Sequence, residues 1–379
     1  KVADLQPDEP QAPLARAQAA QLRGKALALY AEQERVLPHG DRRVNIQFQM
    51  ARLNQDLGRL AEAKNHWRNL SQQDLSRTIR NEAILRLGEM SEDENTPLSL
   101  KDAETYYGRV IEECTAGDLC PYVKFRLAWL LRREGRIEAA IPMMRDSLWD
   151  AKGGVREDSL RDLIVFHCAQ PSNGEAALTE IEALSAKLSR PELIANLADG
   201  FFSSGNKVAG VRVLEFVETR SPSFSQKVRL LEELYGLRQW DRFRGLFLET
   251  AALPLTAVEG ISPESLEKSE KILRRLVVQL DGERISDLRF LPDFQAAVAL
   301  HLKQFPRHSD SFKLMEGGLA SEPDGVRKET QIKEWLGAFS LAPEQVIRLR
   351  EIRIGSAQRG RRLEIVAEEA GALATLVTA

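Results

Sequence analysis

The side chains best suited to catalysis or metal binding are scattered along this chain. Its five histidines stand at positions 39, 66, 167, 301 and 308. His167 precedes Cys168, but neighbouring residues on a helix point in different directions and do not readily chelate one metal. The motifs G-x-x-x-x-G-K-S/T, G-x-G-x-x-G, H-E-x-x-H and C-x-x-C do not occur. We therefore expect no metal and no cofactor.

Two further patterns resemble sites of chemistry, and a solvated surface is favoured for both. Ser265 and Lys268 have the S-x-x-K spacing of some acyl-transferring serine enzymes, but they lie at a charged helix start without an accompanying motif. Arg359, Arg361 and Arg362 form a basic run that would suit phosphate or an acidic partner. Acidic residues follow closely, which favours a solvated helix face. No catalytic residue is expected, and an α-helical enzyme is kept only as an alternative.

Cys114 and Cys120 bracket the segment T-A-G-D-L between two predicted helices. This loop is short enough for a disulfide across the turn, and two unrelated, half-buried thiols are the alternative. A disulfide would indicate a periplasmic or extracellular compartment.

The chain begins at Lys1, and residues 1–13 are rich in proline and acid, which is typical of a flexible linker. Such a linker would follow a cleaved signal or an N-terminal anchor, and it would equally precede a domain whose upstream part was removed. With the cysteine pair, this segment predicts a periplasmic or cell-envelope location, and a cytoplasmic location is the alternative.

The composition is that of a folded, water-soluble protein, with 43% apolar and 29% charged residues. The 53 basic residues are balanced by 56 acidic ones, which weighs against a nucleic-acid partner. No uncharged apolar window reaches the roughly 18 residues of a membrane span, so none is expected. Leu, Ala, Arg and Glu dominate, and these residues have high helix propensity. The expected fold class is all-α.

The helices that carry these residues follow a pattern that occurs at least twice. Residues 47–70 and 122–148 each have the form of two short amphipathic helices joined by a tight turn. A small residue precedes the turn glycine by seven positions, and an alanine follows it by five; a third copy surrounds Gly205. The small positions and turn glycines are Ala51, Gly58, Ala63, Ala128, Gly135, Ala140, Gly205 and Gly210.

Each of these residue types has a physical reason. Glycine at the turn supplies left-handed backbone at the end of the first helix. The small residues let two helices approach closely, while Trp67 or Met144 fills the gap to the next pair. The equivalent second-helix positions from Ala63 to Phe243 lie 40, 37, 37, 33 and 33 residues apart. These spacings bracket a repeat period of about 34 residues.

The combination resembles the tetratricopeptide repeat (TPR) family over residues 40–250, and Sel1-like or other α-solenoid repeats are the alternative. The resemblance implies a right-handed superhelical solenoid of antiparallel helix pairs, with residues 14–250 as the repeat array. Residues 251–379 are expected to continue the helices and to cap the array. An exposed docking segment at 367–379 is the alternative. Gly355 and Gly360 predict an interruption of the helix that begins near Pro343.

This fold predicts a non-enzymatic scaffold that binds a protein or peptide partner in a concave groove lined by the first helices of the pairs. By register, the predicted partner-binding residues are Gln47, Asn54, Tyr122, Lys124 and Arg132. The alternative is a structural or targeting module of a larger bacterial envelope assembly, or of an enzyme whose chemistry lies elsewhere.

Overall fold

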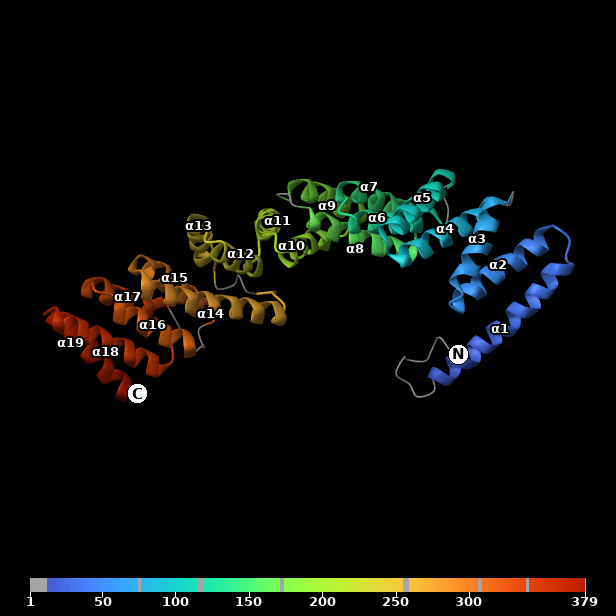
Figure 1. The fold of residues 1–379 in the computed structure, drawn as a ribbon. Helices are drawn as coiled ribbons and strands as arrows, with labels where there is room; N and C mark the ends of the chain where they lie inside the picture. The colour runs from blue at the N-terminus through green and yellow to red at the C-terminus, as the bar shows by residue number, and fades with distance from the viewer. Residues whose placement is uncertain are drawn as a thin grey trace. The chain divides into compact units, whose positions relative to one another are not determined.

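The computed structural model describes residues 12–73, 76–114, 119–170, 174–254, 259–305, 309–338 and 341–378. Within these ranges the regular secondary structure is entirely helical, which confirms the predicted all-α class. The chain forms two compact units, Lys1–Pro171 and Ser172–Ala379, whose helices are labelled in Figure 1. The predicted linker lies outside the described residues apart from Ala12 and Pro13, which begin the first helix.

Unit 1 is a chain of helices in which each one packs against the next. Short connections make successive helices antiparallel neighbours. Helix starts follow local chemistry: the Thr96 hydroxyl accepts a hydrogen bond from the Ser99 amide at 3.1 Å, and Pro97 occupies the first helical position of α5. The helices are α1 (Ala12–Val36), α2 (Asp41–Asp56), α3 (Leu60–Gln72), α4 (Arg77–Glu94), α5 (Pro97–Glu113), α6 (Cys120–Arg133), α7 (Ile137–Asp150) and α8 (Gly153–Ala169).

Unit 2 continues the pattern of short, packed helices, and the predicted boundary at residue 250 lies inside its helix α13. The helices are α9 (Glu175–Leu188), α10 (Glu192–Ser203), α11 (Lys207–Arg220), α12 (Phe224–Gly236), α13 (Trp240–Ala252), α14 (Pro263–Ser286), the 3-10 turn η2 (Leu288–Phe290), α15 (Leu291–Gln304), α16 (Ser309–Ser321), α17 (Gly325–Ala338), α18 (Pro343–Arg359) and α19 (Leu363–Thr378).

The predicted interruption at Gly355 is wrong. Helix α18 runs through Gly355 without a break and ends at Arg359, with Gly360 as its C-cap. Glycine weakens an isolated helix by about 1 kcal/mol relative to alanine, but α17 and α19 both pack on α18 and outweigh that preference. Helix α19 is held to α18 by the buried Glu369 carboxylate, which pairs with Arg350 and Arg353.

The repeat positions have the conformations that their residue types predict. Three turn glycines adopt left-handed backbone, with φ of 72° at Gly58, 78° at Gly135 and 84° at Gly205. A Cβ atom at Gly210 would lie 2.7 Å from the Phe202 ring, so only glycine fits there without a shift. The four repeat alanines are fully buried, namely Ala51, Ala63, Ala128 and Ala140. Close helix approach at small residues therefore occurs in both units.

Replacing Ala140 with leucine should destabilise unit 1 by about 1–3 kcal/mol, because the extra methyl groups overpack a fully buried contact. The measurement is urea unfolding followed by circular dichroism. Ala139→Leu is the matched control, since Ala139 lies next to it on α7 but is exposed. Its effect should stay within about 0.5 kcal/mol. Equal shifts for the two variants would contradict the assigned packing.

Candidate interaction surface and charged pocket

The first helices of unit 1 are tied to one another by polar contacts that span one repeat. The donor and acceptor residues are 33 or 34 positions apart in the sequence. Each donor lies on α6, and the acceptor carboxylates lie on α4 and α8. The contacts are Tyr122 Oη to Glu89 Oε1 at 2.9 Å, Arg126 Nη2 to Glu92 Oε2 at 2.8 Å, and Trp129 Nε1 to Asp162 Oδ2 at 2.9 Å.

These carboxylates are largely buried and need the partners that α6 supplies. Glu92 also accepts a hydrogen bond from Tyr107 Oη at 2.7 Å. Burial and this bond to a carboxylate raise the pKa of Tyr107, so its hydroxyl stays a donor. Burial by itself would lower the pKa of Arg126, but the hydrogen bond to Glu92 and the neighbouring charges raise it overall. Arg126 is therefore a permanent cation at this surface.

Large side chains form a stripe along one face of α6. Tyr122, Arg126, Trp129 and Arg133 stand at i, i+4, i+7 and i+11, which share one face of a helix. The first three are half-buried, and the Arg133 side chain is 42% exposed. We call these four residues the α6 stripe. Tyrosine, tryptophan and arginine are the residue types that most often dominate binding energy at protein interfaces.

Arg132 lies beside the stripe and stacks on it. Its guanidinium carbon is 4.8 Å from the centroid of the Trp129 ring and 5.3 Å from that of Phe166. The two rings also meet edge to face, with centroids 5.1 Å apart. A cation over an aromatic face adds of the order of 1 kcal/mol and restricts both side chains. The indole of Trp129 is thus held by Arg132 over its ring and by the Asp162 carboxylate of α8 at its nitrogen.

The predicted partner-binding residues have different outcomes. Asn54 is buried, with only 3% of the residue exposed, which disfavours a direct contact with a partner. Gln47 is half-buried and donates to Glu34 Oε1 at 2.7 Å. Lys124 bonds Asp150 on α7 at 2.7 Å, so it is directed to the second helix of its own pair. Tyr122 belongs to the α6 stripe, and Arg132 packs against it.

Sequence reasoning missed three members of the stripe, Arg126, Trp129 and Arg133. The sequence did contain a signal for them, because the three residues follow Tyr122 by 4, 7 and 11 positions and therefore share its helix face. The choice of this face over its neighbours needed the positions of the carboxylates on α4 and α8.

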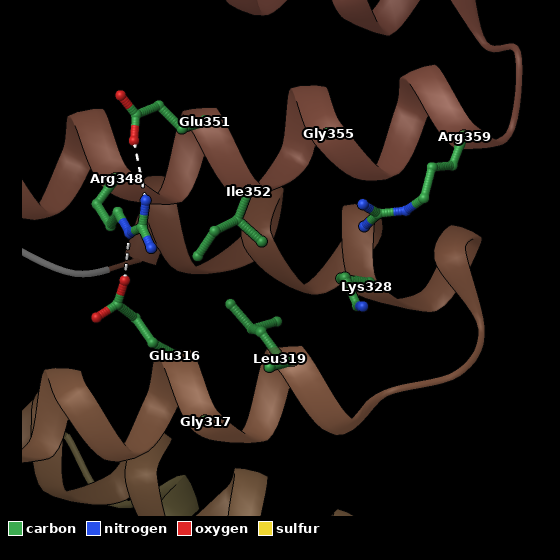
Figure 2. Close-up of a pocket in the computed structure, with 10 residues that line it drawn as sticks. Glu316, Gly317, Leu319, Lys328, Arg348, Glu351, Ile352, Gly355 and Arg359 are labelled. Carbon is green, nitrogen blue, oxygen red and sulfur yellow. Dashed lines mark hydrogen bonds and ion pairs between the residues drawn. The ribbon is translucent and has the colours of Figure 1, made fainter.

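A pocket of about 590 Å³ lies in unit 2 between α16, α17 and α18. Figure 2 shows the Arg348 side chain between Glu316 and Glu351, away from the end occupied by Lys328 and Arg359. Arg348 donates from Nε to Glu316 at 2.6 Å and from Nη1 to Glu351 at 3.3 Å. The remaining lining residues are small or apolar, namely Gly317, Leu319, Ala320, Ile352 and Gly355.

The cationic end of the pocket has an unusual lysine. Lys328 is only 9% exposed, and burial lowers the pKa of its ammonium group. The nearby positive charge of Arg359 lowers this pKa further, while Glu322 opposes both effects. The Lys328 amide donates to the Asp324 carbonyl at 3.0 Å at the start of α17, but among the residues that the structure describes none forms a hydrogen bond or close ion pair with the side chain of Lys328 or of Arg359. Two cations therefore face one end of the pocket without a bonded acid.

Ser265 and Cys168 lie in the sequence patterns considered for catalysis or metal binding, and their surroundings indicate structural roles. The Ser265 amide donates to the Ser262 hydroxyl at 3.2 Å, so Ser262 caps α14 and the S-x-x-K segment lies at the start of that helix. Burial raises the pKa of the Cys168 thiol to about 12, which keeps it protonated and unreactive. Within the described ranges, no group of three or more His, Cys, Asp and Glu residues is placed to hold a metal ion. No helix in those ranges is long and apolar enough to cross a membrane.

The antiparallel helix pairs, the left-handed glycine turns and the buried alanines define a TPR-like helical repeat protein. No family model matches the chain, and no curated protein matches it.

Similar solved structures are repeat proteins or complexes. The TPR domain of P58(IPK) is 12% identical, with 87% of this chain and 92% of that one covered and a TM-score of 0.29. The structure of Naa15/Naa10 bound to HypK-THB is 12% identical, with coverage of 88% and 51% and a TM-score of 0.37. A circular tandem repeat protein is 16% identical, with coverage of 97% and 72% and a TM-score of 0.12. The TPR-like class therefore rests on this chain's own helix pairs, turn glycines and buried alanines.

The Arg126–Glu92 pair should show a coupling energy of about 1–2 kcal/mol in a double-mutant cycle of Arg126→Met and Glu92→Gln, because the carboxylate is mostly shielded from water. Urea unfolding of the four proteins measures it. Lys271 and Glu267 on α14 are the comparison pair, since both are well exposed and should show no measurable coupling. If Arg126 and Glu92 also showed no measurable coupling energy, their role in joining α4 to α6 would be contradicted.

Proposed function

We propose that this protein is a non-enzymatic scaffold that holds a segment of a partner protein against the α6 stripe. The observation that carries the proposal is the stripe itself. Aromatic and arginine side chains lie side by side, partly exposed, on a first helix whose neighbours on both sides anchor them. These residue types are the ones enriched in binding hot spots, which supports the proposal.

Pre-organisation supports the same proposal. A long side chain that is immobilised on binding costs about 0.5–1.5 kcal/mol of conformational entropy. Arg126 and Trp129 are already held by Glu92 and Asp162, so a partner would meet them in fixed positions. An extended segment or one helix laid across α4, α6 and α8 is the binding mode that suits such a surface.

The partner is to be obtained by affinity capture from native cells and identified by mass spectrometry. Trp129→Ala should then weaken its affinity at least tenfold, because truncating a hot-spot tryptophan typically removes 2 kcal/mol or more. Trp149→Ala is the matched control, since Trp149 lies on the second helix α7 with part of its surface exposed. Isothermal titration with the purified partner measures both.

Arg133→Ala separates lost binding from lost folding, because the Arg133 side chain is well exposed and its removal leaves the core intact. It should also weaken binding, by a smaller factor. Equal affinities for Trp129→Ala, Trp149→Ala and the unmodified chain would place the partner elsewhere and refute the role of the α6 stripe.

We also propose a periplasmic or cell-envelope location, in which the scaffold belongs to a larger envelope assembly. The support is the Cys114–Cys120 disulfide, whose Cα atoms are 5.8 Å apart. Disulfides persist in oxidising compartments and are rare in the cytosol. Cys168 is the remaining cysteine; it is buried and takes no part in a disulfide.

A thiol assay on native protein, denatured without reductant, should find one reactive thiol per chain, that of Cys168. After reduction the same assay should find three. The protein must be taken from its own cells and alkylated at lysis, so that oxidation in air does not create the bond. Three thiols before reduction would remove the structural support for an oxidising compartment.

A further inference from the structure

The pocket of unit 2 is electrically asymmetric. At one end Lys328 and Arg359 bring two positive charges without a bonded acid. At the other end Glu316 and Glu351 share the single guanidinium of Arg348, which leaves one negative charge in excess. Each of these carboxylates uses one oxygen for Arg348, so the other oxygen can accept a further hydrogen bond.

Small residues keep the space between these two ends open. Gly317 and Ala320 on α16 and Gly355 on α18 line the pocket, with Leu319 and Ile352 as its apolar part. A Cβ atom added at Gly355 would have no atom within 4 Å, so this position faces open space. The volume of about 590 Å³ is that of a site for a drug-sized ligand and is far larger than one small anion requires.

We propose that this pocket binds a short peptide segment of a protein partner that carries an acidic side chain, a small apolar residue and a basic side chain in a row. The acidic group pairs with Lys328 and Arg359, and the basic group pairs with the free oxygens of Glu316 and Glu351. The proposal rests on the scaffold function above and gives that scaffold a second contact, with its own sequence preference.

Charge complementarity favours this occupant over a simple anion. A carboxylate placed between a buried ammonium and a guanidinium forms charge-assisted hydrogen bonds, the strongest class in proteins. It also relieves the repulsion between Lys328 and Arg359, which at present lowers the pKa of the lysine. A phosphate ion would satisfy that end alone and would leave the apolar middle and the Glu316–Glu351 end unoccupied.

The test uses the full chain and peptides with acetylated and amidated ends. The two zwitterionic probes are Gly-Glu-Ala-Lys-Gly and its reverse, Gly-Lys-Ala-Glu-Gly, which cover both chain directions. The neutral probe is Gly-Gln-Ala-Gln-Gly. Saturation-transfer NMR and isothermal titration should show at least tenfold tighter binding for one zwitterionic probe than for the neutral one. Equal affinities, or no binding by either zwitterionic probe, would overturn the proposal.

Variants locate the binding. Gly355→Leu should abolish it by filling the pocket, whereas Gly282→Leu should leave it unchanged. Gly282 is the matched control because it also lies four residues before the end of its helix and faces open space. Lys328→Met and Arg359→Gln remove one charge each without adding bulk, and each should weaken binding at least tenfold. Binding that survives all three pocket variants would refute the assigned site.

Two further arms separate this proposal from its rivals and from the scaffold function. Inorganic phosphate that displaces the probe completely at equal concentration would indicate a site for small anions only and would overturn the peptide assignment. Trp129→Ala should bind the probe normally, because that residue belongs to unit 1. If the partner is lost with Trp129→Ala while no peptide binds the pocket, the scaffold function stands and the pocket proposal fails.

Discussion

Close approach of helices at small side chains is the constraint on which both units depend. One helix pair has an apolar face that it cannot bury alone, so pairs must stack, and the smallest residues at the crossing set how near they come. Ala128 and Ala140 are fully buried in unit 1, and the Phe202 ring leaves no room for a side chain at Gly210 in unit 2. Stability is therefore distributed over neighbouring contacts and is not concentrated in one core.

The same stacking brings together polar residues that lie one repeat apart in the sequence. In unit 1 this places carboxylates of α4 and α8 beside donors of α6, at separations of 33 and 34 residues. In unit 2, Arg348 meets Glu316 and Arg362 meets Glu329, at separations of 32 and 33. A surface that is fixed in this way has little conformational freedom left to lose when a partner binds.

Side-chain size then decides what each unit offers to a partner. On α6 the first-helix face carries Tyr122, Arg126 and Trp129, which reach carboxylates on the adjacent helices α4 and α8. On α16 and α18 the corresponding region carries Gly317 and Gly355, which leave a pocket between the helices. One packing scheme thus places half-buried large side chains on α6 in unit 1 and leaves a charged pocket in unit 2.

The sequence by itself determined the helices, the turn glycines and the buried alanines, because these depend on local backbone preference and on a period that is visible in the chain. Tertiary structure decided which face of each helix meets solvent. Asn54 looked available by register and is buried, while Arg126 became prominent only through a carboxylate 34 residues away. It also decided that α18 continues through Gly355, since packing by its neighbours outweighs the weak helix propensity of glycine.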